Sequence, residues 1–417
     1  MNRHFEQILI TWLGLIALII CLWPKGIVLG IAGLAVLVIY GYVIKKISFQ
    51  WSLPALTFIA LYAVYFIGTF FTNHQSLANH YIESKLSFVV FPVLLSFRFT
   101  KKVDWRPVVI GLTAGIIGVS IIGFANAATT YGKTGQLLAS FTSSNFSNIH
   151  HPSYLCVFIL TAAALLWHGY RQAWKGFSLK WMLPVYAYFF LIYGLCLSLA
   201  GILLLFILTG ILIARWIYRR FGKKVFFGAL IVLPALCIPL FLVIPQMKQQ
   251  FSDASKYFLE FAKSPSGFVK AKQGYKEGNE VRLIMWTVAT EEFMQHPFGV
   301  GTGNVDDHLS YRLTLYGQTE MAKKDGENGI QYNPHNQFLQ TALEIGVVGL
   351  LLLFTLFSSI LRFAWKHRNY ALLIMTACLV FNALFESMFQ RQSGIVFFSF
   401  WICLLIVYSH SQQKDVA

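Results

Sequence analysis

The chain has 417 residues, of which 57% are hydrophobic and 12% are charged, with a mean hydropathy of +0.61. Soluble domains carry about a quarter charged residues, so this composition excludes an ordinary soluble enzyme. Lys and Arg number 33 against 17 Asp and Glu, but they are not gathered on a polar domain, and no nucleic-acid partner is expected. The six cysteines lie inside apolar runs, which predicts neither a disulfide framework nor a cysteine zinc site.

Apolar runs of about 20 residues, long enough to cross a bilayer as helices, recur along the chain. Twelve are predicted, near residues 7–23, 26–44, 53–71, 86–99, 107–130, 153–170, 181–198, 200–217, 225–244, 337–360, 370–389 and 394–409. The first run continues into the second without a cleavage site, so it is expected to remain as a span. The predicted fold class is an all-α polytopic membrane protein of about twelve helices with one large, mainly helical loop.

The basic residues predict the orientation. With a cytoplasmic N-terminus, the inner loops hold 19 Lys and Arg and the short outer loops hold four, which is the bias of the positive-inside rule. The other ten lie with eleven acids in one 92-residue outer loop. We therefore expect both termini in the cytoplasm and three regions: spans one to nine at 1–244, a loop subdomain at 245–336, and the last three spans with a short tail at 337–417.

Two glutamates are predicted inside spans, where a charge is costly. Each shares a helix face with two amides at i, i+4, i+8 spacing; the two stripes are Asn336, Gln340, Glu344 and Asn382, Glu386, Gln390. Both stripes are expected in the outer half of the bilayer, where they would line one polar cavity. For either glutamate alone, hydrogen bonding between helices is an equally good interpretation.

Two residues at the ends of the large loop are candidates for chemistry. His335, in the run 333–337, is expected at the membrane surface where a helix begins, and an imidazole there can accept a proton from a hydroxyl. Arg282 opens an amphipathic helix that is predicted to close at His296, and its guanidinium can bind phosphate in a bidentate way. Each residue taken alone also fits an ordinary surface side chain.

Three other patterns contain residue types that bind ligands. The alternating glycines Gly299, Gly301 and Gly303 could cradle phosphate, but no Walker lysine or dinucleotide fingerprint accompanies them, so a tight turn is favoured. His150 and His151, at the outer mouth of the sixth span, lack the spacing of a zinc pair. The trio 306–308, Asp-Asp-His, is expected to be solvated loop. No metal site and no cofactor are predicted.

The stretch 334–350, with its pattern HNxxLQ, an acid, then GxxG entering a span, resembles the signature of the O-antigen ligase and polymerase superfamily. Three further pieces agree with it: residues 150–154, residues 282–303, and the segment from Glu386 to Phe398. The resemblance covers roughly residues 80–405. It departs from the family at Ser198-Leu199, where the family has a Ser-Arg pair, so another cation must take the place of the missing arginine.

The resemblance implies a multi-span glycosyltransferase of the bacterial inner membrane. Such an enzyme takes a glycan from an undecaprenyl-pyrophosphate carrier at the periplasmic face and passes it to an acceptor, which in the ligase branch is the lipid A core. The family's histidine maps onto His335 and its loop arginine onto Arg282, the two expected catalytic residues. Substrate contacts are expected from eight others: Lys85, His150, His151, Asn336, Gln340, Glu344, Glu386 and Arg391. The missing positive charge would come from Lys85, Arg391 or the loop lysines.

This chemistry requires no metal, because pyrophosphate is already a good leaving group and cationic side chains can neutralise it. Ligation of O antigen to lipid A core is the favoured function. An O-antigen polymerase or a protein O-oligosaccharyltransferase of the same superfamily remains an alternative, since the motifs are shared. A flippase for lipid-linked glycans, from a different class, would not require a large outer loop with a histidine and an arginine at its ends.

Overall fold

The computed structural model describes residues 4–222, 245–272, 278–323 and 332–412. Helices dominate it, and the all-α polytopic fold class is confirmed. Up to residue 222 the elements are α1 (Phe5–Leu22), η1 (Pro24–Gly26), α2 (Ile27–Val43), β1 (Ile47–Phe49), α3 (Leu53–Gly68), η2 (Thr69–Phe71), α4 (Gln75–Lys85), α5 (Ser87–Leu94), β2 (Phe97–Phe99), α6 (Arg106–Thr134), α7 (Leu137–Ser140), α8 (Ser143–Phe146), α9 (Pro152–Arg171), α10 (Leu179–Leu195) and α11 (Leu199–Phe221). The elements after residue 244 are α13 (Pro245–Lys263), α14 (Pro265–Ala271), α15 (Asn279–Gln295), α16 (Val305–Leu315), α17 (Thr319–Ala322), α18 (Gln337–Lys366), α19 (Tyr370–Ala383) and α20 (Gln392–Gln412).

Among the described residues, eight helices are long and apolar enough to cross a membrane, and α10 and α19 are shorter apolar helices. The predicted ninth span, 225–244, lies outside the described residues. The fourth span is placed differently from its prediction: helix runs from Gln75 to Leu94 in two pieces that meet at Leu86. The chain then forms the short strand β2, which pairs antiparallel with β1. The total of twelve spans is therefore not established.

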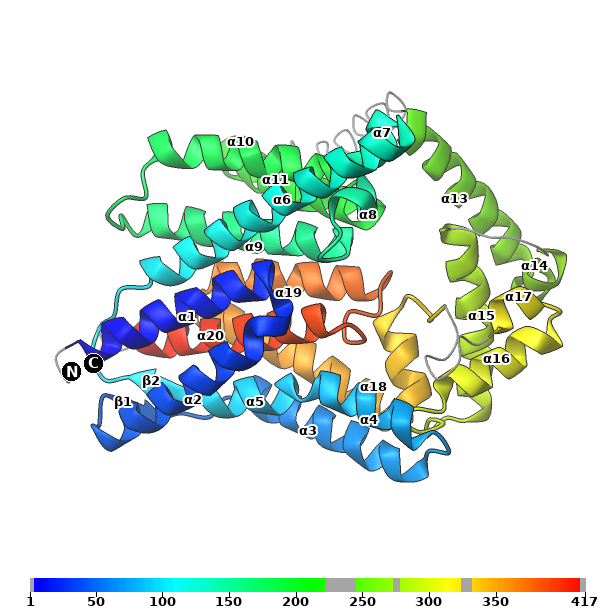
Figure 1. Cartoon of the computed structure of the whole chain (residues 1–417), viewed down its shortest axis with the longest axis horizontal. Helices are drawn as coiled ribbons and strands as arrows, with labels where there is room; N and C mark the ends of the chain where they lie inside the picture. Colours follow the sequence, from blue (N-terminus) through cyan, green and yellow to red (C-terminus); the bar gives the residue numbers. More distant parts are fainter. Residues whose placement is uncertain (1–3, 223–244, 273–277, 324–331, 413–417) are drawn as a thin grey trace.

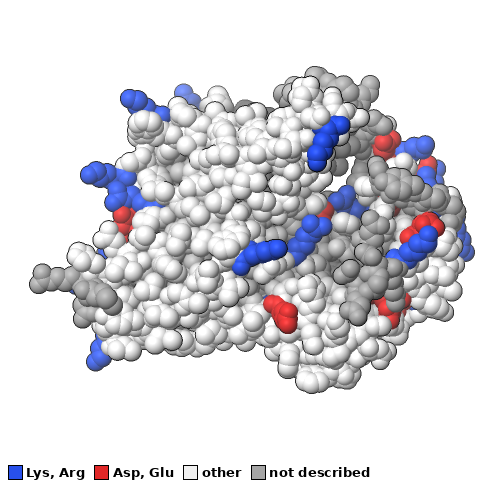
Figure 2. Space-filling view, viewed as in Figure 1, with Lys and Arg blue, Asp and Glu red and all other residues white. Residues whose placement is uncertain are grey.

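The membrane helices pack around α20, in which almost every residue from Gly394 to Ser411 is buried. Large apolar side chains elsewhere remain exposed on the outside of the bundle, including Val36, Phe190 and Trp216. In Figure 2, Lys and Arg lie at the left end of the visible face and again from its centre to its right end, and the broad surface between the left end and the centre is uncharged. An uncharged apolar band is typical of a membrane-spanning protein, because lipid tails cannot solvate charged side chains.

Helices α13–α17 lie at one end of the molecule, and the chain begins and ends at the other (Figure 1). Their buried side chains form a hydrophobic cluster of their own, which includes Val269, Met285, Leu309 and Leu313 and reaches Leu343 of α18. The predicted amphipathic helix that begins near Arg282 and closes at His296 is α15. The loop region is therefore a packed helical layer seated on the N-terminal end of α18.

Helix α18 is interrupted at Ile345 and Gly346, where the backbone leaves the helical conformation and Gly346 has φ +65°. The glycine run 298–304 fills this break: the N–H of Val300 donates to the Leu343 carbonyl (2.8 Å) and that of Gly301 to the Glu344 carbonyl (3.1 Å). In return, the N–H of Val347 donates to the Pro297 carbonyl. The predicted tight turn is confirmed, and its amides are engaged with the protein rather than open to phosphate.

A side chain at Gly346 would have no room, because its Cβ would lie 2.2 Å from the backbone of Phe298. Gly299 is confined in the same way, because a Cβ there would lie 2.6 Å from the Gly346 nitrogen. A break in a membrane helix leaves backbone N–H and C=O groups without partners inside the helix. Here the glycine turn supplies those partners.

Candidate functional site

Glu386 holds together the two residues that were predicted to be catalytic. Its Oε1 accepts a hydrogen bond from the Arg282 guanidinium at 2.8 Å, and its Oε2 lies 3.1 Å from Nδ1 of His335. Arg282 also donates from Nε to the Phe385 carbonyl at 3.3 Å. A residue from α15, one from the approach to α18 and one from the α19–α20 connection therefore meet at a single carboxylate.

Local structure fixes His335 in a backbone conformation with φ +45°, outside the helix. The helix begins two residues later than the sequence suggested, with Asn336 as its N-cap: the Asn336 Oδ1 accepts from the N–H groups of Phe338 and Leu339. Asn333 accepts from the N–H of His335 at 2.8 Å. These two asparagines shape the turn that presents the imidazole, because short amide side chains bond readily to nearby backbone groups.

Glu386 lies in the connection between α19 and α20, which corrects the predicted stripe. Helix α19 ends at Ala383, so Asn382, Glu386 and Gln390 do not share a helix face. Because the chain is not helical at this point, the Glu386 carboxylate can contact both Arg282 and His335. A side chain on a continuing helix would not lie in this position.

The electrostatics of the site favour ionised Glu386. Burial by itself raises the pKa of this carboxyl. The hydrogen bond with His335 and the charges of His151, His335 and Arg282 outweigh burial and lower the pKa of Glu386 to about 2. At neutral pH the carboxylate therefore holds Arg282 and fixes the hydrogen on Nδ1 of His335. Within the described parts of the chain, Nε2 of His335 has no hydrogen-bond partner, so this nitrogen remains able to take a proton.

A cavity of about 580 Å³ opens beside Arg282 and Glu386. Its polar lining includes His151, which lies 4.0 Å from Glu386, and Ser153, whose hydroxyl lies 3.1 Å from that of Ser198. The apolar part of its lining includes Leu199, Leu203, Phe258, Trp286 and Phe385. The family's arginine would follow Ser198, and here that position places Leu199 in the cavity wall.

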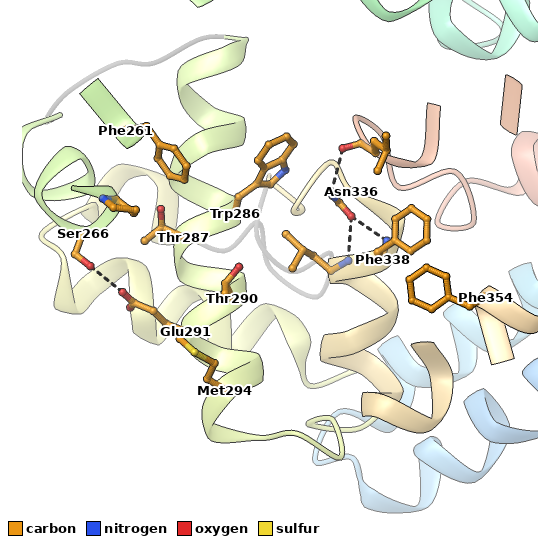
Figure 3. Close-up of a pocket in the computed structure, with 13 residues that line it drawn as sticks. Phe261, Ser266, Trp286, Thr287, Thr290, Glu291, Met294, Asn336, Phe338 and Phe354 are labelled. Atoms are coloured by element: carbon orange, nitrogen blue, oxygen red, sulfur yellow. Dashed lines mark hydrogen bonds between the residues drawn. The ribbon is translucent and has the colours of Figure 1, made fainter. Parts of the chain in front are cut away.

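A second cavity, of about 660 Å³, lies between α15 and α18 and is almost wholly apolar (Figure 3). Trp286 lines both cavities, and its indole N–H donates to the Pro334 carbonyl next to His335. Phe338 and Phe354 of α18 form the facing wall, and Asn336 closes the end nearest to His335. Two concave surfaces of different polarity thus approach the same histidine.

The structure divides the predicted site residues into two groups: those near the polar cavity and those buried within the helix bundle. Arg282, Glu386 and His151 line the polar cavity, His335 contacts Glu386 beside it, and Asn336 caps the helix that follows. Arg391 is exposed, close enough to affect the electrostatics of His151. His150, by contrast, is buried, and its Nε2 lies 2.6 Å from the Cys21 carbonyl, which makes it part of the bundle's packing.

Lys85, Gln340 and Glu344 form a separate, buried cluster. Lys85 Nζ lies 3.4 Å from Glu344, and the two side chains are 0% and 1% exposed. Glu344 also accepts from the side-chain amides of Gln340, at 2.6 Å, and Gln390. The two glutamates therefore do not line one polar cavity as the sequence suggested: Glu386 lines the polar cavity, and Glu344 pairs at the break in α18.

Sequence reasoning missed three contributors to the site: Trp286, Ser153 and Asn333. The Trp286 position was visible on the apolar face of the predicted helix, but nothing in the sequence indicated that it lines two cavities. Ser153 lies within the HHPSY stretch and Asn333 lies next to Pro334, so both were in motifs already singled out. Their roles depend on partners far along the chain.

The arrangement defines a polytopic membrane protein with an Arg–Glu–His centre at the end of the bundle that helices α13–α17 cover. Residues 185–354 match the family model O-Antigen ligase. This match confirms the resemblance to the O-antigen ligase and polymerase superfamily over that part of the chain. The match includes Arg282, His335 and Glu344, whereas Glu386 lies beyond it. No curated protein matches the chain.

Proposed function

We propose that the chain is a glycosyltransferase that moves a glycan from an undecaprenyl-pyrophosphate carrier to an acceptor at the periplasmic face of the bacterial inner membrane. The acceptor proposed is the lipid A core, which would make the enzyme an O-antigen ligase. The observation that carries this proposal is the pair Arg282 and His335, held on opposite oxygens of Glu386 beside two cavities. An anion-binding cation and a proton acceptor are the two groups that this transfer requires.

In the proposed reaction, an acceptor hydroxyl attacks the anomeric carbon of the donor glycan. The new carbon–oxygen bond forms as the bond from that carbon to the pyrophosphate oxygen breaks, and the carrier pyrophosphate leaves. The hydroxyl proton passes to Nε2 of His335, and the imidazolium is stabilised by Glu386 through Nδ1. Arg282 uses two donors for Glu386 and Phe385, so its remaining N–H groups can bind the departing pyrophosphate.

The family's second cation has no counterpart at Leu199. Lys85 is an unsuitable replacement because it is fully buried against Glu344. Arg391 is exposed and near His151, and Lys256 is exposed on α13 between Ser255 and Phe258, which both line the polar cavity. We propose that these two side chains supply the missing charge when the donor is bound.

The proposed orientation has support from the arrangement of the helices. The chain begins and ends at one end of the bundle, and α13–α17 cover the other end (Figure 1). Together with the 19 basic residues predicted for the inner loops, this supports cytoplasmic termini and a periplasmic loop region.

Deletion of the gene followed by gel analysis of surface glycans tests the proposal. A ligase predicts carrier-linked polymer that accumulates beside bare lipid A core. Core that bears a single repeat would identify a polymerase instead, and loss of glycan from a surface protein would identify a protein O-oligosaccharyltransferase. Glycan trapped on the cytoplasmic side would contradict transfer and indicate a flippase. Complementation of the deletion with Arg282→Ala is the matched control. This variant keeps the fold but lacks the anion-binding group, so it tests whether that group is needed for transfer.

A further inference from the structure

Three side chains able to bind a metal converge away from the Arg–Glu–His centre. They are Glu292 in the last turn of α15, His296 at its C-cap and His308 in the first turn of α16. Glu292 Oε1 lies 3.2 Å from Nε2 of His296 and 2.7 Å from Nδ1 of His308, and all three ligand atoms lie within 4.8 Å of one another. Zinc bonds of about 2.0–2.2 Å in tetrahedral geometry put neighbouring ligand atoms roughly 3.3 Å apart, so only small shifts are needed to accept an ion.

The carboxylate is already oriented for this role. Its second oxygen, Oε2, accepts from Nε of Arg312 at 2.5 Å, which turns Oε1 toward both histidines. In metal sites, a hydrogen bond to the part of a ligating side chain that does not bind the metal fixes the orientation of that side chain. The Glu292 side chain is only 4% exposed, whereas those of His296 and His308 are 44% and 35% exposed. An ion would therefore be anchored on a buried carboxylate and still be reachable by water.

We propose that Glu292, His296 and His308 form a zinc site. Two imidazoles and one carboxylate are donors that Zn²⁺ accepts readily, with water in the fourth position. Mg²⁺ and Ca²⁺ prefer an all-oxygen shell, which this group does not offer. The charges nearby also favour a cation, because Glu291 and Glu292 near the end of α15 and Asp306 and Asp307 in the first turn of α16 outnumber Arg312 of α16.

The site is structural rather than catalytic. Arg282 and Glu292 are ten residues apart on α15, which corresponds to about 15 Å of helix. A zinc ion would join the end of α15 to the start of α16 and so close the glycine turn 298–304 between them. That turn fills the break in α18 through Val300 and Gly301. Zinc would therefore stabilise the seating of the loop helices on the membrane bundle, whatever reaction the chain performs.

Zinc binding by the full-length protein in detergent tests this inference. The protein is purified with a tag that contains no histidine, stripped with EDTA, and titrated with Zn²⁺ against a chromophoric chelator. We expect one ion per chain and a rise in the unfolding temperature on zinc addition. His296→Gln and His308→Gln should each weaken zinc binding by about tenfold or more. The matched control is His80→Gln, an exposed histidine on α4, which should bind zinc as the wild type does.

Because both ligand histidines are partly exposed, these variants are expected to fold, and their elution and unfolding without zinc confirm it. Two results would overturn the site: a stripped wild-type protein that binds no zinc at tens of micromolar, or His296→Gln and His308→Gln proteins whose affinity equals that of His80→Gln. Neither result depends on glycan transfer, so failure of this inference is distinguishable from failure of the proposed function.

Discussion

Nδ1 of His335 and Oε2 of Glu386 lie 3.1 Å apart, although 51 residues separate them in the chain. This contact selects the nitrogen of His335 that stays available as a base, because the carboxylate binds the hydrogen on Nδ1. It also makes Glu386 a positioning residue for the proposed reaction, since its carboxylate holds Arg282 as well.

The first prediction follows from this contact. Glu386→Gln should lower the rate of glycan transfer by about 100-fold, the scale of a general-base contribution, because a neutral amide neither fixes the tautomer of His335 nor balances Arg282. Transfer in liposomes measures the rate. Glu320→Gln, which removes an exposed carboxylate on α17, is the control and should leave transfer unchanged. A Glu386→Gln enzyme with more than about a tenth of the wild-type rate would show that Glu386 does not position the base.

A pH series of unfolding measurements tests whether Glu386 is ionised in the folded protein. The pKa of Glu386 is lowered from 4.5 to about 2 in the folded protein, so ionised Glu386 stabilises the fold above pH 4.5. That stabilisation is lost as the pH falls from 4.5 through 2. The difference in unfolding temperature between the wild type and Glu386→Gln should therefore shrink over this range. A difference that stays constant down to pH 2 would contradict the depressed pKa.

The second prediction concerns His335. Its φ of +45° is a conformation that asparagine adopts more readily than alanine, so His335→Asn is a sharper variant than His335→Ala. Both should reduce transfer by about 100-fold or more, because neither side chain is a base. The asparagine variant should also keep the wild-type unfolding temperature. His80→Asn is the control, and transfer by His335→Asn above about a tenth of wild type would contradict the assignment.

The third prediction tests how Arg282 binds phosphate. Arg282→Lys should be nearly as inactive as Arg282→Ala. The planar guanidinium can bond Glu386, the Phe385 carbonyl and a phosphate at once, and an ammonium group cannot reproduce this geometry. Transfer measured at several donor concentrations should show both a lower rate and weaker donor binding. Arg362→Lys, at an exposed position near the end of α18, should behave as the wild type. If Arg282→Lys regains most of the activity, Arg282 acts only as a point charge.

The sequence predicted the elements that depend on local pattern and missed those that depend on distant partners. Hydropathy located most spans, and α15 was located from its apolar face and from Pro297. The break at Gly346 was not predicted, because its partners Val300 and Gly301 are more than 40 residues away and an apolar helix continues on both sides. The end of α19 before Glu386 was missed for a similar reason: the partners of Glu386 in the unwound connection, Arg282 and His335, lie 104 and 51 residues earlier in the chain.

The same limit applies to the site. Arg282 and His335 could be identified because their residue types suit the chemistry and match a family signature. Spacing wrongly placed Asn382, Glu386 and Gln390 on one helix face, because i, i+4, i+8 periodicity holds only while the helix continues and α19 ends at Ala383. Glu344 and Glu386 were expected to line one cavity because both stripes were placed in the outer half of the bilayer. The zinc ligands Glu292 and His308 lie 16 residues apart on two helices, a separation with no local signature.

The fourth prediction concerns the buried pair of Lys85 and Glu344. Lys85 Nζ lies over the rings of Tyr65 and Tyr81, 4.7 and 5.1 Å from their centroids. Removing one partner leaves an uncompensated charge, so Lys85→Met or Glu344→Gln alone should cost about 3–5 kcal/mol of stability. The double variant should be more stable than either single one, and unfolding in denaturing detergent measures this. Equal losses in all three variants would show that the charges are not coupled.

The exposed pair Lys323–Glu320 provides the matched comparison, since its side chains are 67% and 69% exposed. Removing either of these partners should change stability little, because water screens the pair. Transfer by the Lys85 and Glu344 variants should fall only as far as the folded fraction falls, since neither residue lies at the polar cavity. A loss of rate with a fully folded protein would instead place Lys85 in donor binding, as the sequence first suggested.

The fifth prediction is that glycan transfer in liposomes survives EDTA. In the proposed mechanism, cationic side chains neutralise the pyrophosphate, and His335 takes the proton. The trio 306–308 does not converge in the structure: His74 bonds to Asp307, Tyr81 donates to Asp306 and His308 bonds to Glu292. The assay must be run well below the unfolding temperature of the stripped protein, because zinc loss from the Glu292 site lowers stability without touching the chemistry. Transfer that collapses under those conditions, and returns with Mg²⁺ or Mn²⁺ but not with Zn²⁺, would contradict the metal-free mechanism.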